Sequence, residues 1–368
     1  MRFILFIVLI CLTAPAFAQV VDTVSHVEDT LTTVLPAEPV SIKPDTLTII
    51  GVGDIMMGTN YPENRLPREE GAFLMKDIEP VLRNADVTFG NLEGTLLDEG
   101  GKPKTCNDPK VCYAFRTPVS YVKNLVNAGF DMMSLANNHA GDMGDAGRKS
   151  SMETLENAGI LHAGQLDQKT TIFEKDSIKY GLVAFAPNSN CVPLNDLEGA
   201  KALVAGLDSL VDIVIVSFHG GAEGVNFQHV PRTVETYYGE NRGNVYAFSH
   251  ALIDVGADVI FGHGPHITRA IEVYKERFIA YSLGNFCTFR GISVSGIKGL
   301  APIIKVYTDK SGKFFRGQIT PTYQTHESGV KIDPGKQVIR IIQELTKKDF
   351  PETPLQIDDN GLITYLAY

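Results

Sequence analysis

The feature that most constrains this chain is a pattern that occurs six times: a short apolar run ends directly in aspartate, glutamate, asparagine or histidine. The runs have the length and composition of β-strands, and the polar residues follow at their carboxyl ends. In an α/β sheet the carboxyl ends of parallel strands share one edge, where ligands bind. We therefore expect the polar groups to meet. They stand in the sequences TLTIIGVGD, DVTFGNLE, SLANNHAGD, DIVIVSFHGGAE, DVIFGHGPH and FIAYSLGNF.

The residue types in these clusters are those that bind divalent metal ions. Carboxylates, amide oxygens and imidazoles suit one or two ions of the Mn, Fe or Zn type, and thiolates are missing from the set. Two ions about 3.5–4 Å apart would draw six to eight such groups from separate strands. The candidate metal ligands are Asp54, either Asn91 or Glu93, Asn138, His219, His263 and His266.

Two residues of the third cluster are left for acid–base chemistry. Adjacent side chains on a tight loop point in different directions, so His139 can face a substrate leaving group if Asn138 faces a metal ion. Asp142 is expected to accept a hydrogen bond from the imidazole and to raise its pKa. The alternative is a structural His–Asp contact that stiffens the loop. Further candidates, for substrate contacts or for orienting the ligands, are Glu223, Arg116 and Asn285.

Each cluster taken alone has an ordinary structural explanation, such as a turn or a hydrogen-bonded loop. However, four of the nine histidines fall in these clusters, which makes separate structural explanations hard to sustain together. Sequence motifs for other chemistries, including GxSxG, HExxH and the P-loop, are absent. The formal net charge of -10 gives no electrostatic help for binding nucleic acid, which we therefore exclude as a partner.

The first 18 residues have the pattern of a secretory signal peptide. Arg2 precedes an apolar stretch over 3–12, and Ala16–Ala18 supplies the small residues of a cleavage site, so cleavage after Ala18 is expected. The apolar stretch is shorter than the ~20 residues of a spanning helix, which disfavours the alternative of a membrane anchor. Because disulfides form in secreted proteins, Cys106 and Cys112, on either side of a short turn-rich segment, are predicted to pair.

The order of the predicted elements indicates the fold class. Residues 19–45 lack any sustained period and are predicted to be a flexible linker. Strands and helices alternate over the domain at 46–325, and a helix and strand at 326–368 are expected to pack on it. This order favours an α/β sandwich with helices covering the sheets. Helices are expected at 76–85, 145–158, 195–210, 230–255 (broken around its glycines) and 337–348.

The sequences GDIMMG, FGNLEG, SLANNHAGDMGDAG, FHGGAE, GHGPH and SLGNF, in this order, resemble the CapA (poly-γ-glutamate capsule biosynthesis) family of the calcineurin-like metallophosphoesterase superfamily. The resemblance covers about residues 47–323. It implies a four-layer α/β/β/α metallophosphatase-like sandwich with a dinuclear metal centre. By position it implies His139 as the general acid, and as metal ligands Asp54, Asn138, His219, His263 and His266.

Three departures from the superfamily pattern concern one of the two metal sites. Met56 stands where a histidine is usual, Glu93 or Asn91 replaces the bridging aspartate, and two residues separate His263 from His266.

The resemblance also implies a role in the cell envelope. The expected protein is secreted or periplasmic, is envelope-associated, and takes part in the biosynthesis of a capsule polymer of the poly-γ-glutamate type, beside polymer synthesis or export machinery. Its expected substrate is an anionic cell-envelope polymer or a phosphoester, cleaved by metal-assisted hydrolysis while His139 protonates the leaving group. The alternative is a non-catalytic accessory protein that binds or guides an anionic polymer during export.

Overall fold

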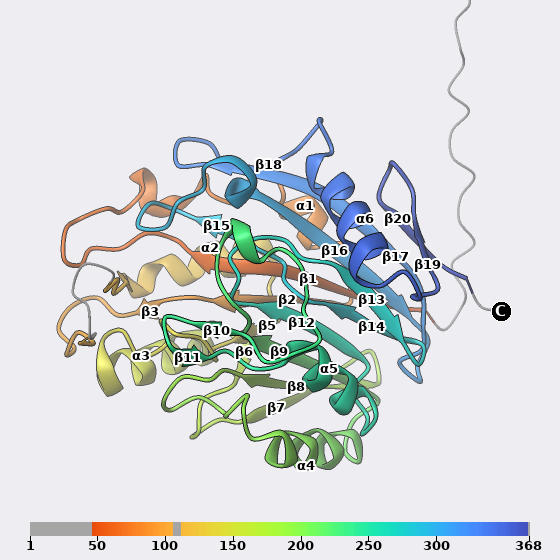
Figure 1. Ribbon diagram of the computed structural model, residues 1–368. Helices are drawn as coiled ribbons and strands as arrows, with labels where there is room; N and C mark the ends of the chain where they lie inside the picture. Colours follow the sequence, from red (N-terminus) through yellow and green to blue (C-terminus); the bar gives the residue numbers. More distant parts are fainter. Residues whose placement is uncertain (1–45, 106–111, 367–368) are drawn as a thin grey trace, which may run out of the picture. The chain divides into compact units, whose positions relative to one another are not determined.

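Two β-sheets form the centre of the structure, a computed structural model that describes residues 46–105 and 112–366 (Figure 1). The larger sheet has the strand order β19-β20-β17-β16-β1-β2-β5-β6, with β15 also paired to β1 and β18 to β17. Strands β1, β2, β5 and β6 run parallel, so their carboxyl ends share one edge. The strands are β1 (Leu47–Met56), β2 (Val87–Leu92), β5 (Met132–Ser134), β6 (Leu161–Ala163), β15 (Asn285–Thr288), β16 (Leu300–Thr308), β17 (Phe314–Thr325), β18 (Gly329–Ile332), β19 (Leu355–Ile357) and β20 (Leu362–Tyr365).

The smaller sheet has six strands in the order β13-β14-β12-β9-β8-β7. Strands β8, β9, β12 and β14 run parallel, and β7 and β13 close the two edges as antiparallel strands. The parallel strands β8, β9 and β12 consist almost entirely of buried residues, as expected for a sheet covered on both faces. The strands are β7 (Thr170–Lys175), β8 (Ile178–Phe185), β9 (Ile213–His219), β12 (Val259–His263), β13 (Ile271–Tyr274) and β14 (Arg277–Ala280).

The two sheets pack face to face through an apolar layer. Phe89 of β2 and Phe261 of β12 stack with ring centroids 5.6 Å apart and planes 8° apart. Ile49 of β1 and Ile215 of β9 belong to the same buried cluster. Truncating a buried phenylalanine to alanine costs about 3–5 kcal/mol, so this layer is a main source of stability. It also fixes the edges of the two sheets relative to each other.

Helices cover the outer face of each sheet, which gives the expected four-layer α/β/β/α sandwich (Figure 1). Buried residues of α1, α2 and α3 pack on the larger sheet, and those of α4 and α5 pack on the smaller one. Helix α6 packs against β16, β17 and β13, and β18, β19 and β20 extend the larger sheet. The helices are α1 (Glu79–Leu82), α2 (Val122–Ala128), α3 (Gly144–Asn157), α4 (Leu197–Asp208), α5 (Val245–Ile253) and α6 (Gln337–Asp349).

Two of the expected helices are shorter than predicted. Of the helix expected over 76–85 only α1 is helical; it begins at Glu79 and not earlier because Pro80 is tolerated only in the first turn of a helix. In the region 230–255 only α5 is helical, and it begins after Asn244, whose side chain accepts a hydrogen bond from the amide of Ala247. Before it lies a small hairpin, β10 (Thr236–Tyr237) and β11 (Glu240–Asn241). A second two-stranded pair is formed by β3 (Thr95–Leu96) and β4 (Arg116–Thr117).

The predicted signal peptide and linker, residues 1–18 and 19–45, lie outside the described residues. Within 46–105 and 112–366, none of the helices is both long enough and apolar enough to cross a lipid bilayer.

The predicted disulfide falls partly outside the described residues. Cys112 is disulfide-bonded, whereas Cys106 lies in the segment 106–111, so the pairing of these two cysteines stays a prediction. Cys191 and Cys287 are buried free thiols. We expect mass spectrometry of the unreduced protein to find one peptide pair joined through Cys106 and Cys112. Alkylation of Cys106 without prior reduction would contradict the prediction.

Candidate metal centre

The larger sheet brings an aspartate and two asparagines to one point on its edge. Asp54 of β1 lies in register with Asn91 of β2 on one side and with Asn285 of β15 on the other. The amide of Asp54 donates to the carbonyl oxygen of Gly284 at 2.8 Å. This close approach requires glycine at position 53, because a Cβ atom on Gly53 would lie 1.9 Å from the same oxygen.

The smaller sheet brings three histidines to the same place. His219 and His263 are the last residues of the neighbouring parallel strands β9 and β12, and they lie in register. The chain then turns through Gly264, where a Cβ atom would lie only 2.7 Å from the carbonyl oxygen of Gly220. His266 follows with a φ of +58°, a left-handed conformation that is uncommon outside glycine and often marks functional sites. This turn lets a second imidazole from the same loop reach the site.

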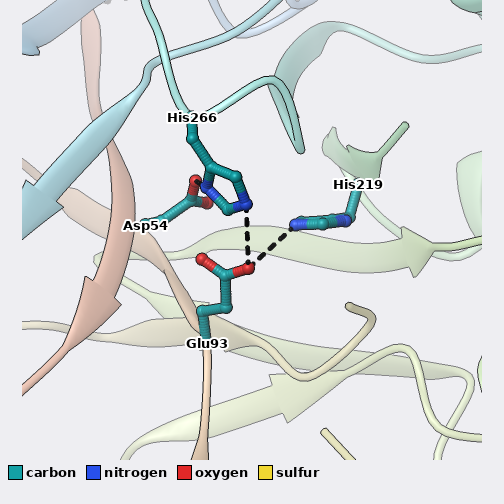
Figure 2. A group of neighbouring side chains, drawn as sticks. All are labelled: Asp54, Glu93, His219 and His266. Carbon is teal, nitrogen blue, oxygen red and sulfur yellow. Dashed lines mark hydrogen bonds and ion pairs between the residues drawn. The ribbon is translucent and has the colours of Figure 1, made fainter. Parts of the chain in front are cut away.

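The side chains from the two sheets meet in one buried cluster (Figure 2). Asp54 Oδ1 lies 3.1 Å from His263 Nδ1, and Asp54 Oδ2 lies 3.0 Å from His266 Nδ1. Glu93 Oε1 lies 3.3 Å from His219 Nε2 and 3.5 Å from His266 Nε2. One potential ligand atom from each of Asp54, Glu93, His219 and His266 lies within 4.8 Å of the others.

Unsatisfied polar atoms indicate that the cluster fits a cation. Glu93 Oε2 and His263 Nε2 are buried and have no hydrogen-bond partner among the described residues, and the same holds for Asn138 Oδ1 in the loop after β5 and for Nδ1 of His219, whose Nε2 faces Glu93. A buried polar atom without a partner costs about 1–3 kcal/mol, so these atoms call for a ligand. Oxygen and imidazole donors without thiolates suit ions of the Mn, Fe or Zn type. The residues present therefore fit a divalent metal ion.

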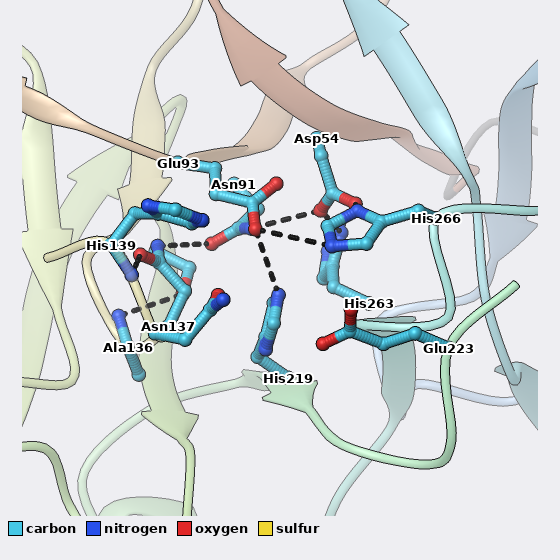
Figure 3. A network of polar contacts seen from close by, with 12 residues as sticks. Asp54, Asn91, Glu93, Ala136, Asn137, His139, His219, Glu223, His263 and His266 are labelled. Carbon is cyan, nitrogen blue, oxygen red and sulfur yellow. Dashed lines mark hydrogen bonds and ion pairs between the residues drawn. The ribbon is translucent and has the colours of Figure 1, made fainter. Parts of the chain in front are cut away.

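A series of amide hydrogen bonds joins Asp54 to the loop after β5 that carries His139 (Figure 3). Asn91 Nδ2 donates to Asp54 Oδ1 at 2.9 Å, and Asn137 Nδ2 donates to Asn91 Oδ1 at 3.0 Å. The backbone amide of His139 donates to Asn137 Oδ1 at 3.1 Å. Because both polar atoms of the Asn91 side chain already form these hydrogen bonds, the geometry favours Glu93 over Asn91 as the metal ligand that follows β2.

Burial and close charges shift the pKa values of the acidic groups in opposite directions. Burial opposes ionisation of Asp54, but the hydrogen bonds from His263 and His266 outweigh it and hold its pKa well below the usual range. Burial raises the pKa of Glu93 to about 8, against the attraction of His266. Burial also lowers the pKa of His219 well below its usual value. For His266, the attraction of Glu93 and Asp54 outweighs burial and raises the pKa to about 10.

These shifts predict that metal binding releases protons. At pH 7 the metal-free protein holds one proton on Glu93 and an extra one on His266, since both pKa values lie above 7. A metal ligand must give up its proton, so we expect ~2 protons to be released per binding event at pH 7. The affinity for metal should rise as the pH passes the pKa of Glu93, about 8, and should continue to rise up to the pKa of His266, about 10. Calorimetry of metal binding in buffers of different ionisation enthalpy measures the release; a heat that does not depend on the buffer would contradict the prediction.

The loop after β5 holds the predicted acid and its carboxylate. His139 Nδ1 lies 2.7 Å from Asp142 Oδ2, which leaves Nε2 as the nitrogen that can meet a substrate. The ring of Phe115 stacks on the imidazole with centroids 4.4 Å apart, and its backbone amide donates to Asp142 Oδ2 at 2.6 Å. The expected rise in the pKa of His139 is wrong. Burial lowers it, the attraction of Asp142 does not compensate, and Lys104 adds to the lowering.

The three candidates for substrate contacts have different surroundings. Glu223 lies beside His263 and His266 (Figure 3) and forms an ion pair with Arg242 at 3.1 Å. Asn285 is buried next to Asp54, and its Oδ1 has no hydrogen-bond partner in the described part of the chain. Arg116 is not brought to the cluster by its contacts: Nε donates to Asn60 at 2.7 Å and Nη1 to the carbonyl oxygen of Gly100 at 2.9 Å.

A four-layer α/β/β/α sandwich with this donor set at the strand ends of both sheets defines a protein of the metallophosphatase-like class. Residues 48–289 match the family described as bacterial capsule synthesis protein PGA_cap, and the chain belongs to this family.

The chain is similar in sequence to capsule biosynthesis proteins of two Bacillus species. It is 29% identical over 268 residues to the capsule biosynthesis protein CapA of Bacillus anthracis, with 67% of this chain and 61% of that protein covered. It is 28% identical over 321 residues to the PGA biosynthesis protein CapA of Bacillus subtilis, with 82% of this chain and 78% of that protein covered. The chain thus spans less than two thirds of the first relative and more than three quarters of the second.

Among solved structures, the chain can be superimposed on a phosphatase from Mycoplasma pneumoniae with a TM-score of 0.46 and 16% identity, which covers 79% of this chain and 95% of that one. A 5'-nucleotidase precursor from Thermus thermophilus gives a TM-score of 0.42 and 15% identity, with 77% and 55% covered. The fold assignment rests on the sheet order and helix layers described above, and not on these superpositions.

Proposed function

We propose that this protein is an envelope protein of capsule polymer biosynthesis whose cluster binds one or two divalent metal ions and hydrolyses a phosphoester or another bond of an anionic polymer. The observation that carries the proposal is the convergence of Asp54, Glu93, His219 and His266, from four separate strand ends, in one buried group with unsatisfied polar atoms. Asn138 and His263 complete the proposed ligand set. A secreted or periplasmic location and a cleaved signal peptide belong to the proposal.

In such a reaction the residues around the site would have different roles. A divalent ion in this site would supply positive charge for the developing charge of the substrate. Asn91 and Asn137 hold Asp54 and the loop that carries His139 in a fixed relation. Asp142 orients the imidazole through Nδ1, so that Nε2 of His139 donates a proton to the leaving group. Arg242 holds Glu223 at the side of the centre next to His266.

A second candidate function is a non-catalytic accessory role, in which the same site binds or guides an anionic polymer during export. The observation that favours it is Met56, which stands where a histidine ligand is usual. Met56 is buried, and its sulfur accepts a hydrogen bond from the amide of Gly58 at 3.3 Å, so it does not replace that ligand. A relative in Mycobacterium tuberculosis, 29% identical over 235 residues, is described as a probable polyglutamine synthesis accessory protein.

Metal analysis combined with a substrate panel separates the two functions. The protein is purified without chelators, its metal content is measured by mass spectrometry, and hydrolysis of phosphomonoesters, phosphodiesters and poly-γ-glutamate is assayed. The proposed function requires bound metal and metal-dependent turnover of at least one substrate. If the protein binds metal and polymer but hydrolyses none of the substrates in the panel, the accessory role is favoured. A protein that takes up no metal at all would contradict the hydrolytic function, and a protein that binds neither metal nor polymer would contradict both.

A further inference from the structure

One lysine outside the proposed ligand set reaches the loop that carries Asn138 and His139. The Nζ atom of Lys104 lies 2.6 Å from Asp142 Oδ1, 3.0 Å from the carbonyl oxygen of Asn138 and 3.3 Å from His139 Nδ1. Its side chain is only 24% exposed. A single ammonium group thus contacts three residues of this loop at once.

The backbone of the same segment is fastened to the loop as well. The amide of Lys104 donates to the carbonyl oxygen of Asp142 at 2.9 Å, and the amide of Lys102 donates to that of Met143 at 3.1 Å. The long side chain therefore starts from a fixed point, which reduces the entropy lost when its ammonium group is held in place.

The buried carboxylate of Asp142 makes the lysine necessary for this arrangement. Asp142 is fully buried, and its two oxygens are shared among Lys104, His139 and the amide of Phe115. A buried charge that loses its partner is strongly destabilising, so without the ammonium group the carboxylate would turn towards other donors. His139 is hydrogen-bonded to that carboxylate and would move with it.

We propose that Lys104 is a positioning residue, which fixes the loop so that the Asn138 side chain and the His139 imidazole are presented to the centre together. The inference rests on the proposed hydrolytic function. It goes beyond that function because Lys104 is neither a ligand nor a proton donor in the reaction and acts through the loop. Its ion pair with Asp142 and its hydrogen bond to the carbonyl oxygen of Asn138 hold the loop at two points, which a single hydrogen bond could not do.

The first test measures the loop directly and needs no substrate. Hydrogen–deuterium exchange of the loop amides is compared in the wild type, Lys104→Met, Lys104→Arg and the matched control Lys102→Met, whose side chain is exposed. We expect exchange in Lys104→Met to rise by about tenfold, as local opening becomes easier, and Lys102→Met to resemble the wild type. Lys104→Arg, which keeps the charge, should recover part of the protection. Unchanged exchange in Lys104→Met would overturn the proposal.

The second test is a double-mutant cycle in the hydrolysis assay. Misplacement of a reacting group by about 1 Å can cost ~10²-fold in rate, so Lys104→Met should lower kcat by up to that factor with little change in KM. Because the lysine acts through both His139 and Asn138, its replacement in a His139→Ala background should change kcat by a clearly smaller factor than in the wild type, and this remaining effect comes from Asn138 alone. Equal effects in both backgrounds would overturn the proposal. Lys104→Gln, which keeps a donor for Asp142, provides the same comparison if the methionine variant does not fold.

The two tests keep the positioning role separate from the proposed function. If no substrate is hydrolysed by the wild type, the proposed function fails, and the exchange experiment still decides whether Lys104 holds the loop. If hydrolysis is found but Lys104→Met changes neither exchange nor kcat, only the positioning role is refuted.

Discussion

His263→Ala will lose most of its bound metal and with it the thermal stability that metal confers. The imidazole of His263 is completely buried, contacts Asp54 Oδ1 at 3.1 Å, and has an unpartnered Nε2 within the described part of the chain. An ion at about 1,000 times its Kd stabilises the native state by about 4 kcal/mol. In a domain of this size that corresponds to a rise in Tm of roughly 6 °C. The variant should lose this rise, as measured by melting curves with and without added metal.

The control for this experiment is another buried histidine. His162 is also buried, but its imidazole contacts Glu156 at 3.1 Å, away from the cluster. His162→Ala should lower the Tm of the metal-free protein and keep the full response to metal. If His263→Ala retains metal and the same response, His263 is not a ligand and the proposed centre is wrong in composition.

His139→Ala will lower hydrolysis by ~10²- to 10⁴-fold, the usual contribution of a positioned proton donor, and will leave metal content close to that of the wild type. The expectation follows from the geometry: Nδ1 is engaged by Asp142, and the contacts to Asp54 and Glu93 come from the other three histidines of the clusters. Measurement of kcat and of metal stoichiometry on the same preparation tests both parts.

The pH profile provides a further check on this role. Burial lowers the pKa of His139 below its ordinary value of about 6.5. As a proton donor it is active when protonated, so kcat should fall as pH rises through that lowered value. This dependence should be absent in His139→Ala. Loss of metal in parallel with activity would make His139 a ligand, and an unchanged rate would leave it without a catalytic role and favour the accessory function.

The sequence predicted the parts of the site that depend on local pattern. Each candidate at a strand end, such as Asp54 or His219, follows a recognisable apolar run, and parallel strands bring their ends to one edge. An α/β sandwich with helices covering the sheets could be expected because strands and helices alternate, whereas the four layers were implied by the family resemblance. The helix expected over 76–85 was placed to begin too early, because an apolar period does not show that Pro80 must lie in the first turn of the helix.

Contacts that depend on tertiary packing could not be predicted. Lys104 lies in a segment without apolar period and meets Asn138 across 34 positions of sequence. The stacking of Phe115 on His139 likewise depends on tertiary packing, and no local pattern in the sequence marks Phe115 or Lys104. Asn137 stands directly beside the predicted Asn138, but only the structure shows that its amide joins Asn91 to the loop.

Arg116 was a plausible substrate contact by charge. It stays a candidate, and its hydrogen bonds to Asn60 and to the carbonyl oxygen of Gly100 are contacts that no local pattern in the sequence indicates.

The origin of the cluster in both sheets has a consequence for how the protein folds. Asp54 and His266 are separated by 212 positions, and His219 and Glu93 by 126. Neither sheet alone can bring these pairs together, so the complete site exists only after the sheets have docked. An interaction that forms so late is absent from an early transition state, and it slows unfolding while leaving the folding rate almost unchanged. We therefore expect bound metal to lengthen the lifetime of the folded protein without changing the rate at which it folds.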